Sequence, residues 1–253
     1  MALRSVSKHF TGVAALENVS LEVWPGQVVC LIGDNGAGKS TLIKILAGVH
    51  EPSSGSISFE GREIRLSSPR DARRFGIATV HQDVGVLELM SVARNFVLGA
   101  EPTKGWGPFR RLDTKLASEI ALERVREIGI RRIANCGQLG GTLSGGERQA
   151  LAIARAMYLG AKVLILDEPT SALGVREAST VLRMISQARE RGVAVIFITH
   201  NATHALSVGD RFIVLIRGIV AADLSRAEAT RERVLDLMGG DEEELSADGN
   251  GPR

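Results

Sequence analysis

Two short glycine-rich stretches constrain what this chain can fold into more than any other feature. The first reads Gly33-Asp34-Asn35-Gly36-Ala37-Gly38-Lys39-Ser40, and the second reads Leu143-Ser144-Gly145-Gly146-Glu147. The spacing of the first is typical of a loop that wraps the phosphates of a nucleotide. The second also offers small residues and bare backbone N–H groups, but it lies far downstream. Because one phosphate-sized anion does not need two such loops from one chain, we expect two copies of the chain to meet. Each copy would offer its second loop to the nucleotide held by the other.

The residues around the first stretch predict a buried strand, a loop and a helix. Residues 27–32 form a nearly continuous apolar run, which is typical of a strand buried on both faces. Residues 39–47 then show helical spacing. Strand, loop and helix in this order are the context that a phosphate-binding loop requires, which argues against a chance glycine-rich turn.

This loop offers several groups to a nucleotide. Its glycines let the backbone curl with N–H groups pointing inward, and the following helix adds the partial positive charge of its N-terminus. Lys39 supplies a cation for the β- and γ-phosphates, Ser40 places a hydroxyl on Mg²⁺, and Thr41 bonds a phosphate oxygen. The loop is therefore expected to bind a nucleoside triphosphate with Mg²⁺, and the family resemblance described below implies that this nucleotide is ATP. The residues of this loop that we expect to bind the nucleotide are Gly33, Asn35, Gly36, Gly38, Lys39, Ser40 and Thr41.

An apolar run at residues 163–166 ends in two carboxylates, Asp167 and Glu168. At the carboxyl end of a core strand, Asp167 can hold Mg²⁺ through a water molecule. Glu168 is then close enough to accept a proton from the attacking water. The alternative is that the two acids cap a helix ahead of Pro169, but the phosphate loop upstream favours the catalytic interpretation.

Gln82 and His200 each follow a predicted core strand, at residues 77–81 and 193–199. Gln82 could reach Mg²⁺ or the water, and His200 could bond the γ-phosphate. A lone Gln or His at a strand end is usually a polar surface residue, but the position that they share favours a site. The expected catalytic residues are Lys39, Gln82, Glu168 and His200, and the expected metal ligands are Ser40, Gln82 and Asp167.

Strands alternate with helices over most of the chain, which predicts an α/β fold with a mainly parallel sheet. A second small strand region, at residues 56–60, follows the first helix and predicts an antiparallel β part. Further along, helical spacing takes over at residues 90–98, 112–129 and 145–159, with a loop at residues 102–108 between the first two. We therefore expect a phosphate-loop NTPase core with an inserted helical part.

The pattern predicts a single domain over residues 1–238. Residues 1–84 and 159–238 would form the nucleotide-binding core with its β part, ending in a helix at residues 227–238, and residues 85–158 would form the helical part. Residues 239–253 are acidic and poor in large apolar side chains, so we expect them to be disordered.

Composition argues against several classes of function. The formal net charge of +2 gives no electrostatic case for nucleic acid. The two cysteines, Cys30 and Cys136, lack the spacing of a metal site. No apolar run approaches the roughly 20 residues that span a bilayer, so any membrane association is expected to come through a partner.

In their order and spacing these motifs resemble those of the ATP-binding subunits of ABC transporters. The likeness covers roughly residues 6–222 and rests on residues 33–41, Gln82, residues 143–149, 164–168 and 171–173, and His200. The resemblance implies that Ser144, Gly145 and Gly146 bind the ATP of the opposite subunit, with Ser144 and Gly146 on its γ-phosphate. It also implies that the ring of Phe10 lies against adenine.

The chain is similar above all to the carbohydrate-import branch of that family, the fructose- and ribose-type ATPases. Residues 82–83, 89–96 and 172–177 carry this likeness. Many members of the branch hold two ATPase halves in one chain, whereas this chain holds one, so we expect a homodimer or a pair with a paralogue. The chain departs from many ABC proteins at two positions. Gly174 stands where Asp is common, in a loop that contacts the opposite subunit, and Glu147 stands where Gln is common. We expect little consequence from Glu147.

The resemblance implies an ATPase that dimerises around two ATP molecules and powers solute import, of a monosaccharide, through transmembrane permease subunits. A solute-binding protein would be an indirect partner, nucleic acid would not be one, and the chain would lie peripherally on the cytoplasmic face of the membrane. A permease helix could dock on apolar side chains of the helical part, which include Val84, Val86, Leu87, Leu89 and Met90, although packing within that part explains them equally well.

Two other classes of function compete with this interpretation. A soluble ABC-type ATPase could act on nucleic acid or the ribosome, but the stretch from Gln82 to Ser144 is too short for the coiled-coil arms of such proteins. A regulatory nucleotide-binding module would bind ATP without hydrolysing it. The presence of Glu168 and His200 argues against this class.

Overall fold

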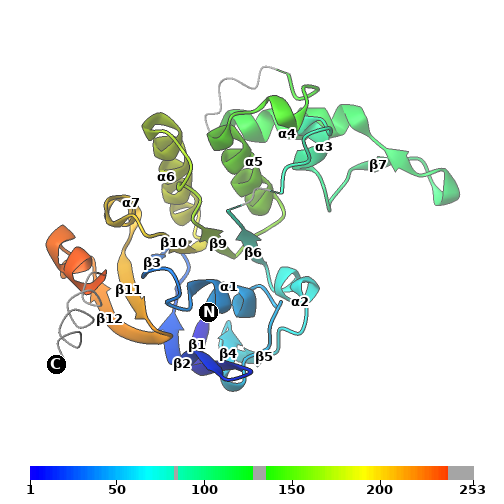
Figure 1. The fold of residues 1–253 in the computed structure, drawn as a ribbon. Coiled ribbons are helices and arrows are strands. Elements are labelled where there is room, and N and C mark those ends of the chain that lie inside the picture. Colours follow the sequence, from blue (N-terminus) through cyan, green and yellow to red (C-terminus); the bar gives the residue numbers. More distant parts are fainter. Residues whose placement is uncertain (83–84, 128–134, 239–253) are drawn as a thin grey trace, which may run out of the picture.

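A six-stranded sheet organises the molecule, in the order β12-β11-β3-β10-β9-β6 (Figure 1). The computed structural model describes residues 1–82, 85–127 and 135–238, so the disorder expected for residues 239–253 lies outside the described residues. Strands β11, β3, β10, β9 and β6 run parallel, and β12 pairs antiparallel with β11. The strands are β3 (Val28–Ile32), β6 (Ile77–Val80), β9 (Val163–Asp167), β10 (Ala194–Ile198), β11 (Arg211–Ile216) and β12 (Ile219–Ser225).

The central strands are apolar because both of their faces are covered. Every residue of β3 and of β10 is buried. Such strands have no solvent face, so they lack the polar–apolar alternation of a half-exposed strand. In the register of the sheet, Ile198 lies opposite Leu31 on one side and opposite Asp167 on the other. The carboxyl ends of β3, β10 and β9 are therefore level with one another.

A second sheet is four-stranded and antiparallel, in the order β2-β1-β4-β5. Its strands are β1 (Ala2–Phe10), β2 (Val13–Glu22), β4 (Ser54–Phe59) and β5 (Arg62–Ile64). Helix α1 (Lys39–Leu46) shares one hydrophobic core with both sheets, since its Leu42 and Ile45 cluster with Val19 of β2 and with Ile165 of β9. The phosphate loop and its helix are thus held from two sides.

Helices α3, α4 and α5 form a group that lies away from the antiparallel sheet (Figure 1). The helix α5 packs against α6, α3 and α4, and its core continues onto the other face of the main sheet through residues such as Phe197 of β10. Besides α1, the described residues contain the helices α2 (Pro69–Arg74), α3 (Val92–Phe96), α4 (Thr114–Glu127), α5 (Gly145–Tyr158), α6 (Val175–Glu190) and α7 (Ala202–Val208), and residues 231–238 are also helical. None of the helices in the described residues is both long and apolar enough to cross a membrane.

The predicted fold class is confirmed: a mainly parallel α/β core carries an antiparallel sheet and a helical part. The loop expected at residues 102–108 is wrong, because Thr103 pairs with Leu112 and Lys104 with Arg111 to form the hairpin of β7 (Thr103–Lys104) and β8 (Arg111–Leu112), with a short 3-10 turn at Gly107–Phe109. The last helix begins at residue 231 rather than 227, after turn residues at 226–228. Besides β7 and β8, the strands β1 and β5 and the helices α2 and α7 were not predicted.

Phe197 offers a direct test of the shared core. Its side chain is fully buried on β10, so we expect Phe197→Ala to leave a cavity and to lower the free energy of unfolding by about 3–5 kcal/mol. Phe109→Ala is the matched control, because that ring is 74% exposed and its removal should cost less than about 0.5 kcal/mol. Urea unfolding followed by circular dichroism measures both, and equal losses in the two variants would contradict this placement of the core.

Candidate active site

The polar residues predicted at strand ends lie along one edge of the main sheet. Because β3, β10, β9 and β6 are parallel and adjacent, the segments that follow them leave the sheet side by side. The glycine loop follows β3, His200 follows β10, Asp167 and Glu168 end β9, and Gln82 follows β6. The structure therefore brings these predicted groups to one edge, in the order given by the sheet rather than by the chain.

The glycine loop needs glycine for two different reasons. At Gly36 the backbone is left-handed, with φ of 88°, and no atom lies within 4 Å of the place where a Cβ would be. A side chain there would be strained by the backbone alone and would point into open space. At Gly38 a Cβ would also meet the carbonyl oxygen of Ala15 at 2.7 Å. The loop is thus packed against β2 on its inner side and open at Gly36.

The N-terminus of α1 leaves its N–H groups available to an anion. Its N-cap is Gly38, which has no side chain to accept from the first turn, and that turn contains no acidic residue. Ser40 is exposed and Thr41 is half-buried in the same turn. Unpaired N–H groups and the helix dipole together favour a bound phosphate at such a terminus.

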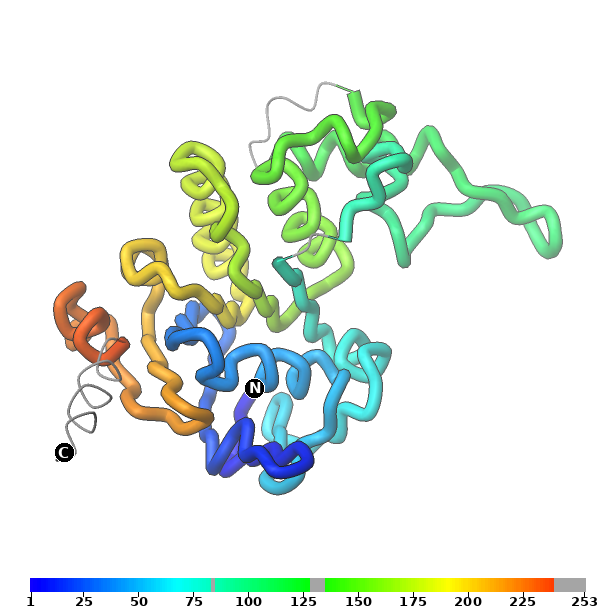
Figure 2. Tube along the Cα trace, viewed as in Figure 1, coloured from blue at the N-terminus to red at the C-terminus, as the bar shows by residue number. Residues whose placement is uncertain are grey.

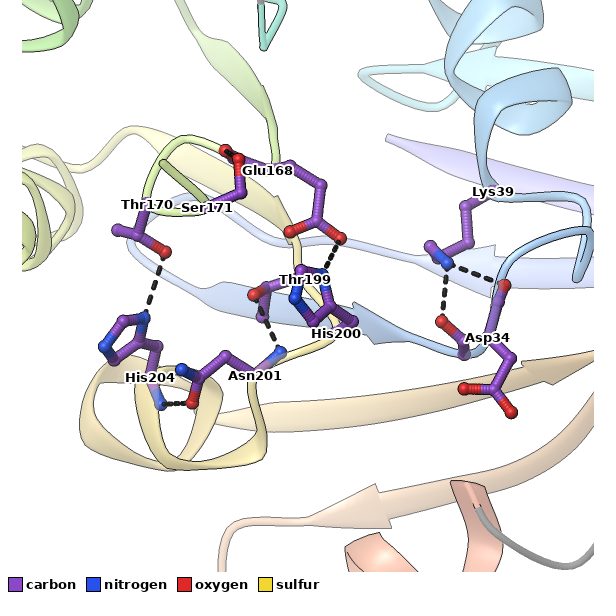
Figure 3. A network of polar contacts seen from close by, with 10 residues as sticks. Asp34, Lys39, Glu168, Thr170, Ser171, Thr199, His200, Asn201 and His204 are labelled. Carbon is purple, nitrogen blue, oxygen red and sulfur yellow. Dashed lines mark hydrogen bonds and ion pairs between the residues drawn. The ribbon is translucent and has the colours of Figure 1, made fainter. Parts of the chain in front are cut away.

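Lys39 is held over this loop by backbone oxygens. Its Nζ donates to the carbonyl of Gly33 at 2.5 Å and to the carbonyl of Asp34 at 2.8 Å (Figure 3). Burial lowers the pKa of Lys39, and the nearby Glu168, Asp34 and Asp167 act in the opposite direction and raise it. An ammonium group has three hydrogens to donate, so this cation keeps one for a ligand.

Glu168 is fixed in an uncommon backbone conformation, with φ of 48°. Its side chain is only 14% exposed, and its Oε1 lies 2.9 Å from Nδ1 of His200. Its Oε2 is buried and has no hydrogen-bond partner among the described residues. Buried acceptors are nearly always satisfied, so an oxygen of this kind suits a donor that arrives with the substrate. His200 itself is 62% exposed at the side chain, so it can face both the carboxylate and a ligand.

Asp167 precedes Glu168 and lies between charged neighbours. Its Oδ2 is 3.8 Å from Nδ1 of His81, which follows β6. Burial raises the pKa of Asp167, and the adjacent Glu168 raises it further, whereas His81 and Lys39 lower it. Within the described residues no group of three or more His, Cys, Asp or Glu side chains could hold a metal ion by itself. Mg²⁺ usually takes one or two protein oxygens and completes its shell with waters and substrate phosphates. The carboxylate of Asp167 and the hydroxyl of Ser40 are oxygen donors of this kind.

Gln82 is exposed, and its backbone carbonyl accepts from Nε2 of Gln149 on α5 at 3.4 Å. The predicted contact of its side chain with Mg²⁺ stays a prediction.

Phe10 ends β1 with 43% exposure, and its ring meets His50 edge-on at 5.4 Å between centroids. Nζ of Lys8 lies 5.2 Å from the centre of the same ring. The half-exposed ring leaves room for the predicted stacking on adenine.

The second glycine stretch begins α5 instead of joining the first loop. Ser144 is the N-cap: its Oγ accepts from the N–H of Glu147 at 3.3 Å, and Oε2 of Glu147 accepts from the N–H of Ser144 at 2.9 Å. This reciprocal pair is a capping box, which Gln can form as well as Glu. Ser144 and Gly145 remain partly exposed, whereas Gly146 is buried, with Glu177 of α6 in contact distance of its absent Cβ.

The exposed-looking apolar side chains expected between residues 83 and 96 divide into two groups. Val86 is buried, at 8% exposure, because it packs in the core of the helical part, so of the two alternatives internal packing holds for this residue. Leu87 and Leu89 are exposed, at 49% and 90%. Met90 is half-buried, and Val84 lies outside the described residues.

Sequence reasoning missed the contacts that hold His200 in place. Thr170 Oγ1 lies 3.0 Å from Nδ1 of His204, and the side chain of Asn201 caps α7 by accepting from the N–H of His204 at 3.0 Å. Thr199 accepts from the N–H of Asn201 at 3.0 Å (Figure 3). These bonds fasten the segment after β10 to the segment after β9. The only sequence signal was Asn201 at a helix N-cap position.

Comparison with known proteins gives consistent results. Residues 16–171 match the family model described as ABC transporter. A xylose/arabinose import ATP-binding protein of Sulfolobus acidocaldarius is 40% identical over 238 residues, which cover 94% of this chain and 93% of that protein. A fructose import ATP-binding protein of Rhizobium meliloti is 41% identical over 83% of this chain and 82% of its own. A ribose import ATP-binding protein of Rubrobacter xylanophilus is 38% identical over 95% of this chain, which spans 47% of that longer protein.

Solved structures share the same fold. The ADP conformation of an ATP-binding cassette of an ABC transporter has a TM-score of 0.78 at 24% identity, covering 98% of both chains. A dimeric post-hydrolysis cassette bound to ADP and Pi has a TM-score of 0.73 at 24% identity, over 89% of this chain and 98% of that chain.

The contact between Thr170 and His204 predicts a pH effect on stability. Burial lowers the pKa of His204, and His200 lowers it further. The unfolded chain therefore binds this proton more readily, so stability is full above the unfolded pKa of about 6.5 and is lost as pH falls toward the folded pKa. We expect His204→Gln to flatten the decline of the melting temperature between about pH 7 and pH 5. An equal flattening in the control variant His9→Gln, at an exposed position of β1, would contradict the assignment to His204.

Proposed function

This chain belongs to the ABC transporter family as one of its ATP-hydrolysing subunits, and from that premise we propose that two copies close around two ATP molecules to power solute import through a membrane permease. The observation that carries the proposal is the separation of the two glycine stretches. The loop at Lys39 lies at the sheet edge beside Glu168, whereas the turn at Ser144 starts a helix of the helical part and stays partly exposed. One chain therefore holds two halves of different sites.

Within one chain, the loop before α1 would bind the phosphates of ATP. Its N–H groups and Nζ of Lys39 would surround the β- and γ-phosphates, and Phe10 would face adenine. The residues that would hold Mg²⁺ are Ser40, Gln82 and Asp167. When bound, Mg²⁺ neutralises charge on the phosphates and so eases attack on the γ-phosphorus.

Glu168 would act as the base for hydrolysis. Its Oε1 is held by His200, which leaves Oε2 to accept a proton from the water that attacks the γ-phosphate. The products are ADP and inorganic phosphate. His200 would also contact the γ-phosphate, and it is exposed enough to do so. Most of the rate enhancement would come from positioning and charge stabilisation, as in phosphoryl transfer generally.

The N-terminus of α5 would complete the site of the other copy. Ser144, Gly145 and Gly146 would offer a hydroxyl and N–H groups to the partner's γ-phosphate. Release of that phosphate removes the shared ligand, so the two copies part. Closing and parting would drive the permease, which would rest on a groove of about 540 Å³ between the helical part and the core. Arg73 of α2, His81 after β6 and Arg155 of α5 line this groove.

The solute is proposed to be a monosaccharide, because the curated relatives cited above are named for the import of xylose or arabinose, fructose and ribose. Mg²⁺, a solute-binding partner protein and the cytoplasmic face of the membrane belong to the same proposal. The alternative, a soluble ATPase acting on nucleic acid or the ribosome, finds no support in these relatives. Its discriminating observation is whether the chain co-purifies with membranes or with nucleic acid.

Lys39→Ala tests the phosphate loop. The variant removes a cation that hydrogen bonds hold over the loop, so we expect ATP affinity to fall roughly 10- to 100-fold. Lys44→Ala, at an exposed position on the same helix, is the matched control and should bind ATP normally. Calorimetric titration with ATP measures both, and unchanged binding in Lys39→Ala would contradict the assignment.

Glu168→Gln tests hydrolysis and dimer formation together. We expect phosphate release to slow by roughly 10²- to 10⁴-fold while ATP still binds, so that ATP holds a stable dimer visible in analytical ultracentrifugation. Adding Ser144→Asp should abolish that dimer, because a carboxylate would face the partner's γ-phosphate. Adding Ser144→Asn should preserve it, because Asn and Asp both cap helices well but only Asp is charged. Near-normal turnover in Glu168→Gln, or a dimer that tolerates Ser144→Asp, would refute the composite site.

A further inference from the structure

The hairpin of β7 and β8 extends away from the rest of the molecule. It leaves the helical part after α3 and returns before α4, and it reaches farther out than any neighbouring segment (Figures 1 and 2). Its tip carries two aromatic side chains, Trp106 and Phe109, which are 79% and 74% exposed. Their ring centroids are 6.4 Å apart, with the rings 62° to each other. The two rings thus form one small apolar surface at the end of an arm.

The folded chain does not explain these two rings. Neither ring belongs to the hydrophobic clusters of the described residues, where large aromatic side chains such as Phe96 and Phe197 are fully buried. A two-stranded hairpin with two paired positions is also marginally stable in water by itself. Exposed apolar groups that gather on such an element are typical of a contact with something outside the chain.

The hairpin of β7 and β8, which we also call the arm (residues 102–112), is basic. Residues 102–112 contain Lys104, Arg110 and Arg111 and no acidic residue. Lys104 is paired with Asp113 at 3.4 Å. The guanidinium of Arg110 donates to the hydroxyl of Thr103, at 2.7 and 3.3 Å, which leaves its charge uncompensated. No carboxylate of the described residues forms an ion pair with Arg110 or Arg111.

We propose that this hairpin docks on an anionic phospholipid surface. Trp and Phe rings favour the boundary between headgroups and acyl chains, and arginines beside them attract lipid phosphates. The proposal rests on the proposed function in one respect, since a transporter subunit works next to a bilayer. The base of the arm also supports it, because Leu98, Gly99 and Glu101 line the groove proposed for the permease. The arm therefore starts at the rim of that groove.

A lipid surface fits these groups better than a second protein does. The hairpin that carries these rings and cations projects from the molecule (Figure 2), and both of its rings are exposed. A fluid layer of negative headgroups needs no shape match and accepts rings and cations together. The cytoplasmic leaflet is negatively charged, so its charge complements that of the arm.

Tryptophan fluorescence on the full chain tests the proposal, because the chain has two tryptophans. Trp24→Phe leaves Trp106 as the reporter, and Trp106→Phe leaves Trp24, which is 60% exposed on another part of the surface, as the control. We expect Trp106 to shift to the blue and to be quenched by brominated lipids in vesicles of phosphatidylcholine and phosphatidylglycerol. Trp24 should show neither change. A Trp106 signal that vesicles leave unchanged would overturn the proposal.

Charge variants complete the test with the same vesicles. One arginine near an anionic surface contributes about a fivefold change in affinity, so Arg110→Gln and Arg111→Gln together should weaken vesicle binding roughly 25-fold. Arg183→Gln, exposed on α6, should leave binding unchanged. Vesicles of phosphatidylcholine alone should bind weakly, and added salt should weaken binding to the anionic ones. Equal binding by all these proteins, or shielding of Trp106 only in membranes that contain the permease, would overturn the proposal and indicate a protein contact.

ATP hydrolysis in solution separates this proposal from the proposed function. The hairpin lies outside the active site, so its variants should hydrolyse ATP at the rate of the unchanged chain. A chain that hydrolyses ATP but ignores anionic vesicles would refute the lipid contact alone. A chain that binds vesicles through Trp106 but never hydrolyses ATP would refute the proposed function alone.

Discussion

The parallel pairing of β3, β10, β9 and β6 is the constraint on which the rest of the structure depends. Strands β3 and β10 are apolar and buried on both faces, and neighbouring strands start and end at nearly the same level. The polar groups of the site appear where the strands end. Parallel strands end at the same edge, so residues from four distant parts of the chain meet there.

Local hydrogen bonds hold the polar side chains at that edge in place. Lys39 is tied to the carbonyls of its own loop, Glu168 to His200, and His204 to Thr170. These contacts hold the side chains of the site in place. The result is an edge that is organised in the protein alone and still has donors and acceptors left for a phosphate and a water.

The helical part differs from the core in what it presents to other molecules. It carries the capped N-terminus of α5, one wall of the groove beside Arg155, and the aromatic hairpin. All three are half-exposed or exposed, and all three lie on one inserted segment between β6 and β9. The contacts proposed with a second copy, a permease and a lipid surface would therefore all be made by this one segment.

The sequence by itself determined the phosphate loop, the strand-end acids and the class of fold, because these depend on local pattern: glycine spacing, apolar runs and the polar residues that follow them. It did not reveal the hairpin at residues 102–112 or the contact between Thr170 and His204, since neither has a local signal. Only the tertiary structure decided that Val86 is buried while Leu89 is exposed, and that Oε1 of Glu168 belongs to His200 while Oε2 stays open. The reason is that burial and hydrogen-bond partners are set by residues distant in the chain, which come together only when the sheet forms.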